Sequence, residues 1–472
     1  MAIKKKQIHL IGIGGVGMTA LANLLLEKGY SVSGSDKNDF AARRILEKKR
    51  VKIYIGHKAD NIKKAEIVIY SSAIPANNIE IKTSQRMKIP LFNRFDFLLH
   101  VLEKKKIISI AGTHGKSTTT AMVAHILKKA KLKPTVYLGA KNKTYPLGSR
   151  WESEKYAVLE TDEHDKSFLK TPSFLSIITN VDDDHLDVNG PYSGKFSLLK
   201  KAFKDFSKNN QTEFIVFNND DSFLRKVAKE SKKNKRNNKV FTFGIDNVAD
   251  LFVKNIYYKG IKTSSDLLLN NKFQGKLELS IPEKENIYNA LGALSASQIL
   301  KIPLKDCLQH LKTFGGIKRR FSILYNKKIA VVDDYAHHPT EIKTSLRMAR
   351  SVFPERRIIL ILEPHRYSRV SLLYKDYASA IKNCDILFLL PIDSAGEKPI
   401  KGVSSEKIYK EITRIKTLNK NKLHLIKNEA SFLKNLLGFQ KNGDVFLFTG
   451  PGKIASLPEK FIHLFRKYER KS

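Results

Sequence analysis

The chain has 472 residues, a length that predicts about three domains. Its hydrophobic content is 42%, and no apolar run reaches the roughly 18 residues of a membrane span, which excludes a transmembrane helix. The formal net charge is +39, but the lysines form short scattered runs, so we interpret the charge as a basic background and not as a nucleic-acid-binding stripe.

The N-terminal residues indicate where the protein is located, and the number of cysteines indicates whether it has disulfides or a zinc site. Residues 1–18 could be mistaken for a signal peptide, but His9 and four glycines interrupt the apolar run, so we expect a cytoplasmic protein. The two cysteines, Cys307 and Cys384, are too few for a disulfide framework or a zinc site. We expect both to be buried as small hydrophobic side chains.

The first predicted element is a strand at residues 7–13, which leads through a glycine-rich loop into a helix. The loop contains Gly12, Gly14, Gly15 and Gly17. This G-x-G-x-x-G pattern, with Asp36 about 20 residues further on, is typical of a dinucleotide cofactor site. The same loop could instead bind the diphosphate of a nucleotide-activated substrate, or serve only strand-to-helix packing.

A second predicted strand, at residues 107–111, leads into a phosphate-binding loop. The loop consists of Gly112, Thr113, His114, Gly115, Lys116, Ser117 and Thr118. It is a shortened pattern, because Ile110 stands where the usual loop has its first glycine. Lys116 would neutralise the β- and γ-phosphates, and the Ser117 hydroxyl would reach Mg²⁺. The loop therefore predicts ATP binding and an ATP-driven step.

Acidic residues follow the next two predicted strands, at 156–159 and 175–178. The segments after them, 160–165 and 179–187, contain most of the acids of this region. Sites in open α/β sheets lie at the carboxyl ends of strands, and Mg²⁺ prefers carboxylate oxygens, so these segments indicate a magnesium site. The alternative is a solvated acidic surface. The basic segment 229–239 is predicted to be a surface loop.

A third passage from strand to helix occupies the C-terminal part. Residues 331–341 place acids, a tyrosine and two histidines in one turn, and Pro339 suits the first position of a helix. The strand at 358–362 leads into residues 363–369, where Arg366 and Arg369 could pair with carboxylate or phosphate oxygens.

Three such passages are typical of α/β domains with parallel sheets. We expect a Rossmann-like N-terminal domain at residues 1–105, a central P-loop ATPase-like domain with a mostly parallel sheet at 106–314, and a Rossmann-like C-terminal domain at 315–472. A charged run at 104–106 and two glycines at 315–316 mark the expected boundaries.

Taken in order, these segments resemble the Mur ligases of peptidoglycan assembly, and most closely the members that add L-alanine to UDP-N-acetylmuramate. The resemblance covers nearly the whole chain. It rests on the segments 12–18, 71–74, 111–117, 160–165, 286–290, 319–321, 333–341 and 364–369.

The resemblance implies that the N-terminal domain binds the UDP part of the substrate, and so favours a substrate diphosphate over NAD at the first glycine loop. Besides the loop glycines, it places Asp36, Ser71 and Ser72 in that site. The central domain would bind ATP, with Asn286 and Asn289 near the adenine. The implied Mg²⁺ ligands are Ser117, Glu160 and His185.

The C-terminal domain, by the same resemblance, closes over ATP and the incoming amino acid. It would contribute Arg320, Asp334, Tyr335, His337, His365, Arg366 and Arg369. The implied reaction forms an acyl phosphate, which the amine of alanine attacks. The expected catalytic group is Lys116, His185, Asp334, His337, Arg366 and Arg369. The amine needs a base, for which His337 and His338 are candidates.

The expected ligands are therefore ATP, Mg²⁺, UDP-N-acetylmuramate and L-alanine. We expect no nucleic-acid or membrane partner, and we expect a monomer or weak homodimer.

The sequence departs from the family pattern at three places. Residues 283–286 read Glu-Lys-Glu-Asn and lack a histidine that the family commonly has. Residues 450–453 read Gly-Pro-Gly-Lys and lack an acid that the family commonly has. Ser117 stands where the nearest relatives usually have threonine, and it keeps the hydroxyl.

Three alternatives stay open from the sequence. A Mur-type ligase that recycles an intact tripeptide would share most of these motifs, although its first loop usually lacks the Gly-Gly-x-Gly run. A dehydrogenase would use the first glycine loop but leave the Lys116 loop unexplained. A nucleic-acid-stimulated ATPase would use the positive charge.

Overall fold

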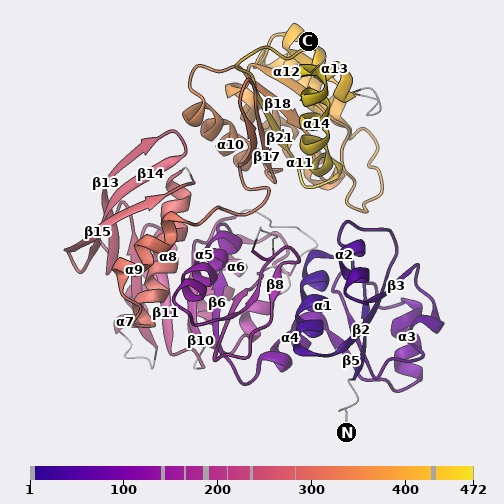
Figure 1. The fold of residues 1–472 in the computed structure, drawn as a ribbon, viewed down its shortest axis with the longest axis vertical. Coiled ribbons are helices and arrows are strands. Elements are labelled where there is room, and N and C mark those ends of the chain that lie inside the picture. Colours follow the sequence, from indigo (N-terminus) through magenta and orange to yellow (C-terminus); the bar gives the residue numbers. More distant parts are fainter. Residues whose placement is uncertain are drawn as a thin grey trace. The chain divides into compact units, whose positions relative to one another are not determined.

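The computed structural model describes residues 6–139, 144–163, 166–183, 191–209, 211–233, 238–281, 283–426 and 432–470. The chain divides into two compact units (Figure 1). The first comprises Met1–Tyr258 and Lys262–Ile317, and the second comprises Lys318–Ser472 with the short piece Lys259–Ile261. The described residues form two sheets in the first unit and one in the second. The two predicted boundaries between the three domains, at residues 105/106 and 314/315, stay predictions.

The N-terminal sheet is parallel, in the order β3-β2-β1-β4-β5. Its strands are β1 (Gln7–Ile11), β2 (Ser31–Asp36), β3 (Lys52–Ile55), β4 (Ile67–Tyr70) and β5 (Leu91–Asn93). Its helices are α1 (Val16–Lys28), α2 (Arg43–Lys48), α3 (Ile79–Arg86) and α4 (Arg94–Leu102). The strand order reverses between β1 and β4, so this crevice is where a Rossmann-like sheet binds its ligand.

The central sheet follows the order β15-β14-β13-β12-β11-β10-β6-β9-β7-β8. Its strands are β6 (Lys106–Ala111), β7 (Thr135–Tyr137), β8 (Ser149–Arg150), β9 (Tyr156–Glu160), β10 (Ser173–Ile178), β11 (Phe214–Asn218), β12 (Lys239–Gly244), β13 (Leu251–Lys259), β14 (Lys262–Leu269) and β15 (Lys272–Leu279). The sheet is mostly parallel, as expected, because all neighbours in the stretch β13-β12-β11-β10-β6-β9-β7 pair in parallel. Antiparallel pairs lie at its two edges, β7–β8 at one and β14–β15 at the other.

The helices of this sheet bury its apolar faces. They are α5 (Lys116–Lys129), α6 (Phe196–Phe206), α7 (Ser222–Lys233), α8 (Lys284–Ile299) and α9 (Leu304–Lys312). Helices α5, α8 and α9 share one core with the sheet, and this core contains the fully buried Cys307. The prediction of a loop at 229–239 was wrong for residues 229–233, which end α7, and for Lys239, where β12 begins; residues 234–237 lie outside the described residues. Buried Val227, Ala228 and Ser231 give this segment a helical face, so its lysines lie on the solvent side.

The C-terminal sheet has the order β16-β17-β21-β18-β19-β20, with β16 antiparallel to β17 and the other pairs parallel. Its strands are β16 (Ser322–Asn326), β17 (Ala330–Asp334), β18 (Ile358–Leu362), β19 (Ile386–Leu389), β20 (Leu423–Leu425) and β21 (Val445–Thr449). Its helices are α10 (Pro339–Val352), α11 (Tyr367–Ala380), α12 (Ser405–Arg414), α13 (Phe432–Gly438) and α14 (Leu457–Glu469). Successive residues of β17, Val331 and Val332, enter different cores, so both faces of the sheet are covered.

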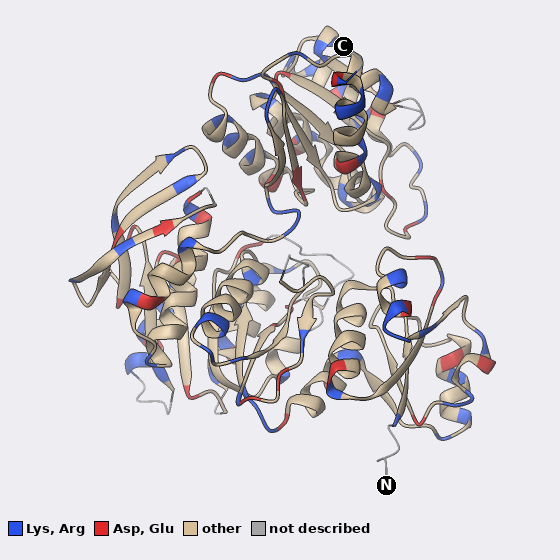
Figure 2. Cartoon of the chain, in the orientation of Figure 1, with Lys and Arg blue, Asp and Glu red and all other residues tan. Residues whose placement is uncertain are grey.

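The structure bears on three predictions from the sequence, which concern the cysteines, the distribution of charge and membrane-spanning helices. Cys384 is buried like Cys307, and burial raises its pKa to about 12, so both cysteines behave as small hydrophobic residues. Figure 2 shows Lys and Arg distributed over the elements of both units with acidic residues among them. Within the described residues, no helix is both long and apolar enough to cross a membrane.

Helix α3 of the N-terminal part carries a fully buried carboxylate, that of Glu80. Burial by itself would raise the pKa of Glu80, but the carboxylate accepts hydrogen bonds from the Ser35 hydroxyl and the Asn61 amide. His57 Nδ1 lies 3.0 Å from the carboxylate, and His9 Nε2 lies at 3.9 Å. These polar partners lower the pKa of Glu80 to about 2.

We predict that Glu80→Gln lowers the melting temperature at pH 7 by at least about 5 °C. The change of the pKa from 4.5 to about 2 corresponds to about 3 kcal/mol. Because the folded-state pKa is the lower one, this stabilisation is complete above about pH 4.5 and is lost as the pH falls toward 2. The difference between variant and wild type should therefore shrink below pH 4.5 in thermal melts followed by circular dichroism.

The matched control is Glu66→Gln in the same sheet, because Glu66 is exposed and its carboxylate accepts one backbone N–H, that of Gln7. It should change the melting temperature much less. Equal effects of both substitutions would contradict the role given to the buried carboxylate.

Candidate active site

The phosphate-binding loop connects β6 to α5 with two glycines in left-handed conformations. Gly112 has φ 134° and Gly115 has φ 79° at the N-cap of α5. A Cβ atom on Gly112 would lie 2.1 Å from Thr179 Oγ1, and one on Gly115 would lie 2.3 Å from Asn289 Oδ1. The loop therefore needs glycine at both positions, and it leads directly into the N-terminus of α5, a position typical of phosphate binding.

The loop is held from the neighbouring strand β10. His114 N donates to Asn180 Oδ1 at 2.8 Å, and the Thr179 hydroxyl donates to His114 O at 2.6 Å. Thr113 N donates to Asn180 O at 3.1 Å. Thr179 and Asn180 are thus part of the loop's scaffold, a role that the sequence pattern of acids around them did not indicate.

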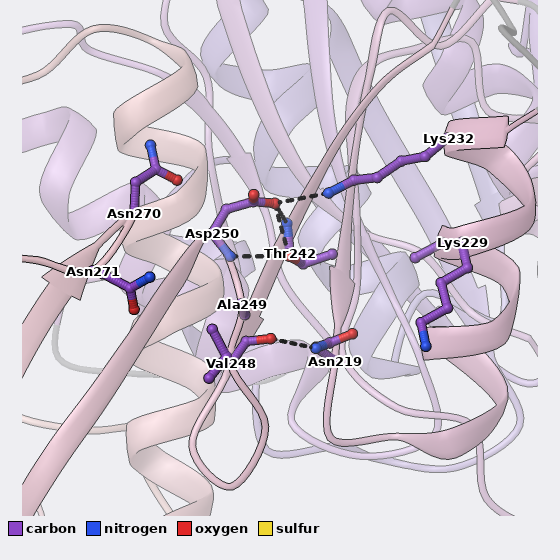
Figure 3. A pocket seen from close by; sticks show the side chains of 10 residues that line it. Asn219, Lys229, Lys232, Thr242, Val248, Ala249, Asp250, Asn270 and Asn271 are labelled. Carbon is purple, nitrogen blue, oxygen red and sulfur yellow. Dashed lines mark hydrogen bonds and ion pairs between the residues drawn. The ribbon is translucent and has the colours of Figure 1, made fainter.

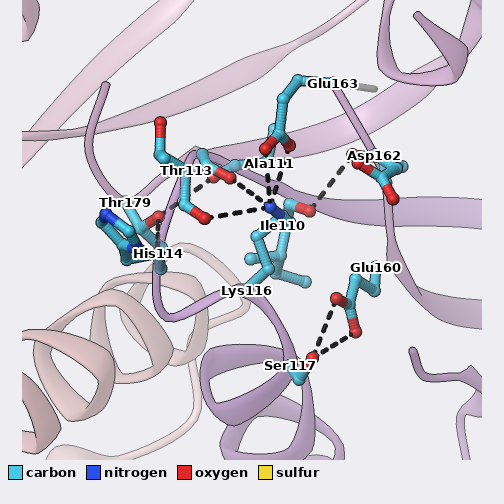
Figure 4. Close-up of polar contacts among 12 residues, drawn as sticks. Ile110, Ala111, Thr113, His114, Lys116, Ser117, Glu160, Asp162, Glu163 and Thr179 are labelled. Atoms are coloured by element: carbon cyan, nitrogen blue, oxygen red, sulfur yellow. Dashed lines mark hydrogen bonds and ion pairs between the residues drawn. The ribbon is translucent and has the colours of Figure 1, made fainter. Parts of the chain in front are cut away.

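Lys116 points toward Glu163 (Figure 4). Its Nζ lies 2.6 Å from Gly112 O, 3.1 Å from Thr113 O and 2.8 Å from Glu163 Oε2. Burial by itself lowers the pKa of Lys116, but the charges of Glu163, Asp162 and Glu160 and the hydrogen bond to Glu163 together outweigh it, so the pKa is raised and the ammonium stays charged. Glu163 belongs to the acidic segment 160–165, but no sequence pattern indicates that it pairs with Lys116.

Ser117 and Glu160 form the second polar pair of the loop (Figure 4). Ser117 Oγ lies 2.8 Å from each carboxylate oxygen of Glu160, and Gly139 N donates to Glu160 Oε2 at 2.6 Å. Two predicted metal ligands are therefore in contact, and their oxygens suit Mg²⁺, which takes few protein ligands. The third predicted ligand, His185, lies outside the described residues. Thr118 follows in the first turn of α5, half-buried.

The two predicted adenine residues lie on α8, next to the start of α5. Asn289 Nδ2 donates to Asn286 Oδ1 at 3.3 Å, and the Thr119 hydroxyl donates to Asn289 Oδ1 at 3.1 Å. At the departure before this helix, Lys284 forms an ion pair with Asp246 at 2.7 Å. The contacts place Asn286 and Asn289 beside the phosphate loop, and their contact with adenine stays a prediction.

The first glycine loop lies between β1 and α1, at the crevice of the N-terminal sheet. Gly14 N donates to Asp36 Oδ2 at 2.9 Å, and a Cβ on Gly14 would lie 2.8 Å from the same oxygen. A Cβ on Gly12 would lie 3.3 Å from Ser71 on the loop after β4, and Ser72 follows Ser71 in that loop. Gly15 is the N-cap of α1. The structure thus brings the predicted substrate-binding residues together at the crevice.

Gly17 at the start of α1 has partners that the sequence did not indicate. The Tyr137 hydroxyl on β7 donates to Gly17 O at 2.9 Å, and Arg94 Nη1 donates to the same hydroxyl at 2.5 Å. A Cβ on Gly17 would lie 2.7 Å from Arg94 Nη1. The end of the first glycine loop is therefore tied to the central sheet by the Tyr137 hydroxyl.

In the second unit, four of the predicted residues form one cluster at the carboxyl ends of β17 and β18. The His337 ring lies 5.4 Å from the Tyr335 ring and 5.3 Å from the His365 ring. Arg369 Nη1 lies 3.4 Å from His365 Nδ1. Burial, with the neighbouring charges of His337 and Arg369, lowers the pKa of His365 to about 4, so this imidazole is neutral at pH 7.

The other predicted residues of this unit have structural partners. Asp334 is buried and accepts a hydrogen bond from the Ser345 hydroxyl, and its burial raises its pKa. Arg320 lies 3.8 Å from Glu341, and Arg366 is the N-cap of α11 with φ 68°. Their catalytic or binding roles stay predictions.

The departure at 450–453 forms a tight turn after β21, between β17 and β18. A Cβ on Gly450 would lie 2.8 Å from Glu363 O, and one on Gly452 would lie 2.3 Å from Asp393 Oδ2. Arg319 donates to the carbonyls of Gly450 and Pro451. Glu363, Asp393 and Arg319 support this turn, and the sequence did not single them out for that role.

A separate cavity of about 430 Å³ lies between the end of α7 and the strands β12 to β14 (Figure 3). Lys232 Nζ and the Thr242 hydroxyl both donate to Asp250 in its wall, at 3.4 and 2.7 Å. None of the residues predicted for catalysis or binding lines this cavity, so it is distinct from the candidate active site.

The chain is similar in sequence to proteins of one family along nearly its whole length. Three family models match in succession: "Mur ligase family, catalytic domain" at residues 7–106, "Mur ligase middle domain" at 110–297 and "Mur ligase, glutamate ligase domain" at 319–452. The UDP-N-acetylmuramate–L-alanine ligase of Aquifex aeolicus is 35% identical over 459 residues, which cover 97% of each chain. The chain belongs to the Mur ligase family.

Two further relatives of this Mur ligase agree with that assignment. The UDP-N-acetylmuramate–L-alanine ligase of Dictyoglomus turgidum is 36% identical over 98% of each chain. The crystal structure of the UDP-N-acetylmuramate-alanine ligase of Thermotoga maritima has a TM-score of 0.83 and 27% identity, with 98% of this chain and 99% of that chain covered. The predicted family and the three-domain α/β fold are confirmed, and the family's use of ATP agrees with the predicted loop.

We predict that Gly112→Ala in this Mur ligase weakens binding of the ATP analogue AMP-PNP by about tenfold or more. The added methyl group would meet Thr179 Oγ1, and alanine is strained at φ 134°, so the loop must move away from its phosphate-binding shape. Calorimetric titration measures the affinity.

The control is Gly438→Ala, because nothing lies within 4 Å of a Cβ at Gly438. It should bind the analogue like the wild type. An unchanged affinity of Gly112→Ala would contradict the proposed geometry of the loop.

Proposed function

We propose that this Mur ligase uses ATP to join L-alanine to the lactyl carboxylate of UDP-N-acetylmuramate, giving UDP-N-acetylmuramoyl-L-alanine, ADP and phosphate. The observation that carries the proposal is the set of full-length relatives, 33–38% identical, that bear the name UDP-N-acetylmuramate–L-alanine ligase. The site supports it, because the chain has one loop suited to the substrate's diphosphate and a second suited to ATP.

A carboxylate is a poor electrophile, so the reaction first needs its phosphorylation to an acyl phosphate. The protein's part in phosphoryl transfer is positioning and neutralisation of charge. Lys116 and the N-terminus of α5 provide positive charge and N–H donors at one loop. Ser117 and Glu160 would hold Mg²⁺, which would supply positive charge to neutralise the phosphates.

The amine of alanine must be neutral when it attacks the acyl phosphate, and phosphate then leaves. A neutral histidine close to the amine could accept the proton. His338 accepts a hydrogen bond from Thr340 N as the N-cap of α10, which occupies one of its ring nitrogens. His337 Nδ1 likewise lies 3.0 Å from Tyr335 O, so His337 and His338 both stay candidates. The neutral His365, in contact with His337, becomes a further one.

We keep the expected cytoplasmic location within this proposal, because ATP and nucleotide-activated sugars are made in the cytoplasm. A monomer or weak homodimer without a nucleic-acid partner also stays a prediction. Stimulation of ATP hydrolysis by DNA or RNA, steeply dependent on salt, would support the nucleic-acid-stimulated ATPase instead.

We predict that the purified protein releases phosphate from ATP when UDP-N-acetylmuramate and L-alanine are both present. Glycine or L-serine should support slower release, because each differs from alanine only in a small side chain. The measurement is a coupled phosphate assay, with each substrate omitted in turn as the control. Turnover with a tripeptide but not with single amino acids would overturn the proposal in favour of the recycling ligase.

A second prediction concerns the two loops. Lys116→Ala should lower turnover by roughly 100-fold or more, because it removes the charge that faces the phosphates. It should leave the affinity for UDP-N-acetylmuramate within about twofold, because that substrate is assigned to the loop after β1. Calorimetry with the UDP-sugar measures this directly, and loss of both properties would refute the division of labour.

A further inference from the structure

We propose that Glu163 is an internal competitor of ATP: its carboxylate pairs with Lys116, and the phosphates must displace it in order to bind. This inference rests on ATP binding at the loop 112–118, which is part of the proposed function. It adds that Lys116 already has an anionic partner within the protein, which a phosphate must replace.

The first argument is the number of donors on Lys116. A lysine ammonium has three N–H donors and no acceptor. Three acceptor groups surround Nζ, namely Gly112 O, Thr113 O and the Glu163 carboxylate, at 2.6, 3.1 and 2.8 Å. Every donor therefore has a partner, so a phosphate oxygen can bind Lys116 only if one of these partners gives way.

The second argument identifies which partner gives way. The two carbonyls belong to the backbone of the phosphate loop, and this backbone is fixed by hydrogen bonds to Asn180 and Thr179. Glu163, in contrast, reaches Lys116 with a side chain that can rotate. Its carboxylate carries the same sign of charge as a phosphate, so the phosphate can replace it without leaving the ammonium unpaired.

The third argument is that Glu163 has an anchored backbone. The Tyr192 hydroxyl donates to Glu163 O at 2.9 Å, and Lys166 N donates to the same oxygen at 3.2 Å. The carboxylate can therefore leave Lys116 while the residue keeps its place. The other nearby glutamate, Glu160, is not the competitor, because its carboxylate faces Ser117 and Gly139 N.

The ion pair is buried, which makes the competition strong. The side chains of Lys116 and Glu163 are 13% and 5% exposed. Charges attract more strongly where water is excluded, and a buried charge without its partner is costly. The ion pair thus balances the charge of Lys116, and it reduces the affinity for any anion that cannot replace the carboxylate fully.

The test measures the affinity for AMP-PNP with Mg²⁺ by calorimetry. Glu163→Gln keeps a side chain of the same shape but removes the competing charge, so it should bind AMP-PNP about tenfold more tightly than the wild type. The control is Asp162→Asn. Asp162 adds to the negative field at Lys116, whereas Glu163 also forms the ion pair, so the control should tighten binding by no more than about threefold.

A second variant and a second measurement distinguish competition between Glu163 and the phosphates from a merely structural contact. Glu163→Asp keeps the charge on a shorter side chain that withdraws from Lys116, so it too should tighten AMP-PNP binding. Without nucleotide, Glu163→Gln should melt at a lower temperature than the wild type, and AMP-PNP should raise its melting temperature more. A structural contact alone would lower the melting temperature without tightening binding.

Equal or weaker AMP-PNP binding by both Glu163 variants would overturn the proposal, because Glu163 would then assist the nucleotide or be indifferent to it. This result would leave the proposed function intact, since that is decided by phosphate release with UDP-N-acetylmuramate and L-alanine. Failure of the wild type to release phosphate with those substrates would, conversely, overturn the proposed function even if the Glu163 variants bind AMP-PNP more tightly.

Discussion

The contact between the ends of β6 and β10 determines the geometry of the ATP site. The two strands are parallel neighbours, so their loops leave the sheet at the same edge. The loops touch so closely that Gly112 has no room for a side chain beside Thr179. This close approach fixes where α5 begins, and so places Lys116 and Ser117. Glu160 then meets Ser117 because β9 flanks β6 on its other side.

The sequence predicted the parts of this arrangement that depend on local pattern. The strand at 107–111, the glycines of the loop and the helix after it follow from hydrophobic runs and backbone requirements within a dozen residues. The pairing of Ser117 with Glu160 was also foreseen as a shared metal site, because the family's motifs supply both residues. In the second unit, the cluster of Tyr335, His337 and His365 could be expected from two loops at strand ends.

The parts that could not be predicted depend on which distant side chains meet. Glu163 pairs with Lys116 across 47 positions, and Tyr137 reaches Gly17 across 120. No periodicity encodes such contacts, because they arise only when the strands are ordered in a sheet. The error at 229–233 has a different cause. A run of lysines looked like a loop, but a narrow buried face is enough to hold a helix against the sheet.

The hydrogen bond from Tyr137 to Gly17 also bears on how this chain can change in evolution. Three residues from separate parts of the sequence, Gly17, Arg94 and Tyr137, share one small space: a larger residue at 17 would meet Arg94, and a phenylalanine at 137 would leave Arg94 without that hydroxyl. Each position thus limits what its two partners tolerate. A lineage that replaces one of them is expected to accumulate compensating replacements at the others, so the three positions should diverge together.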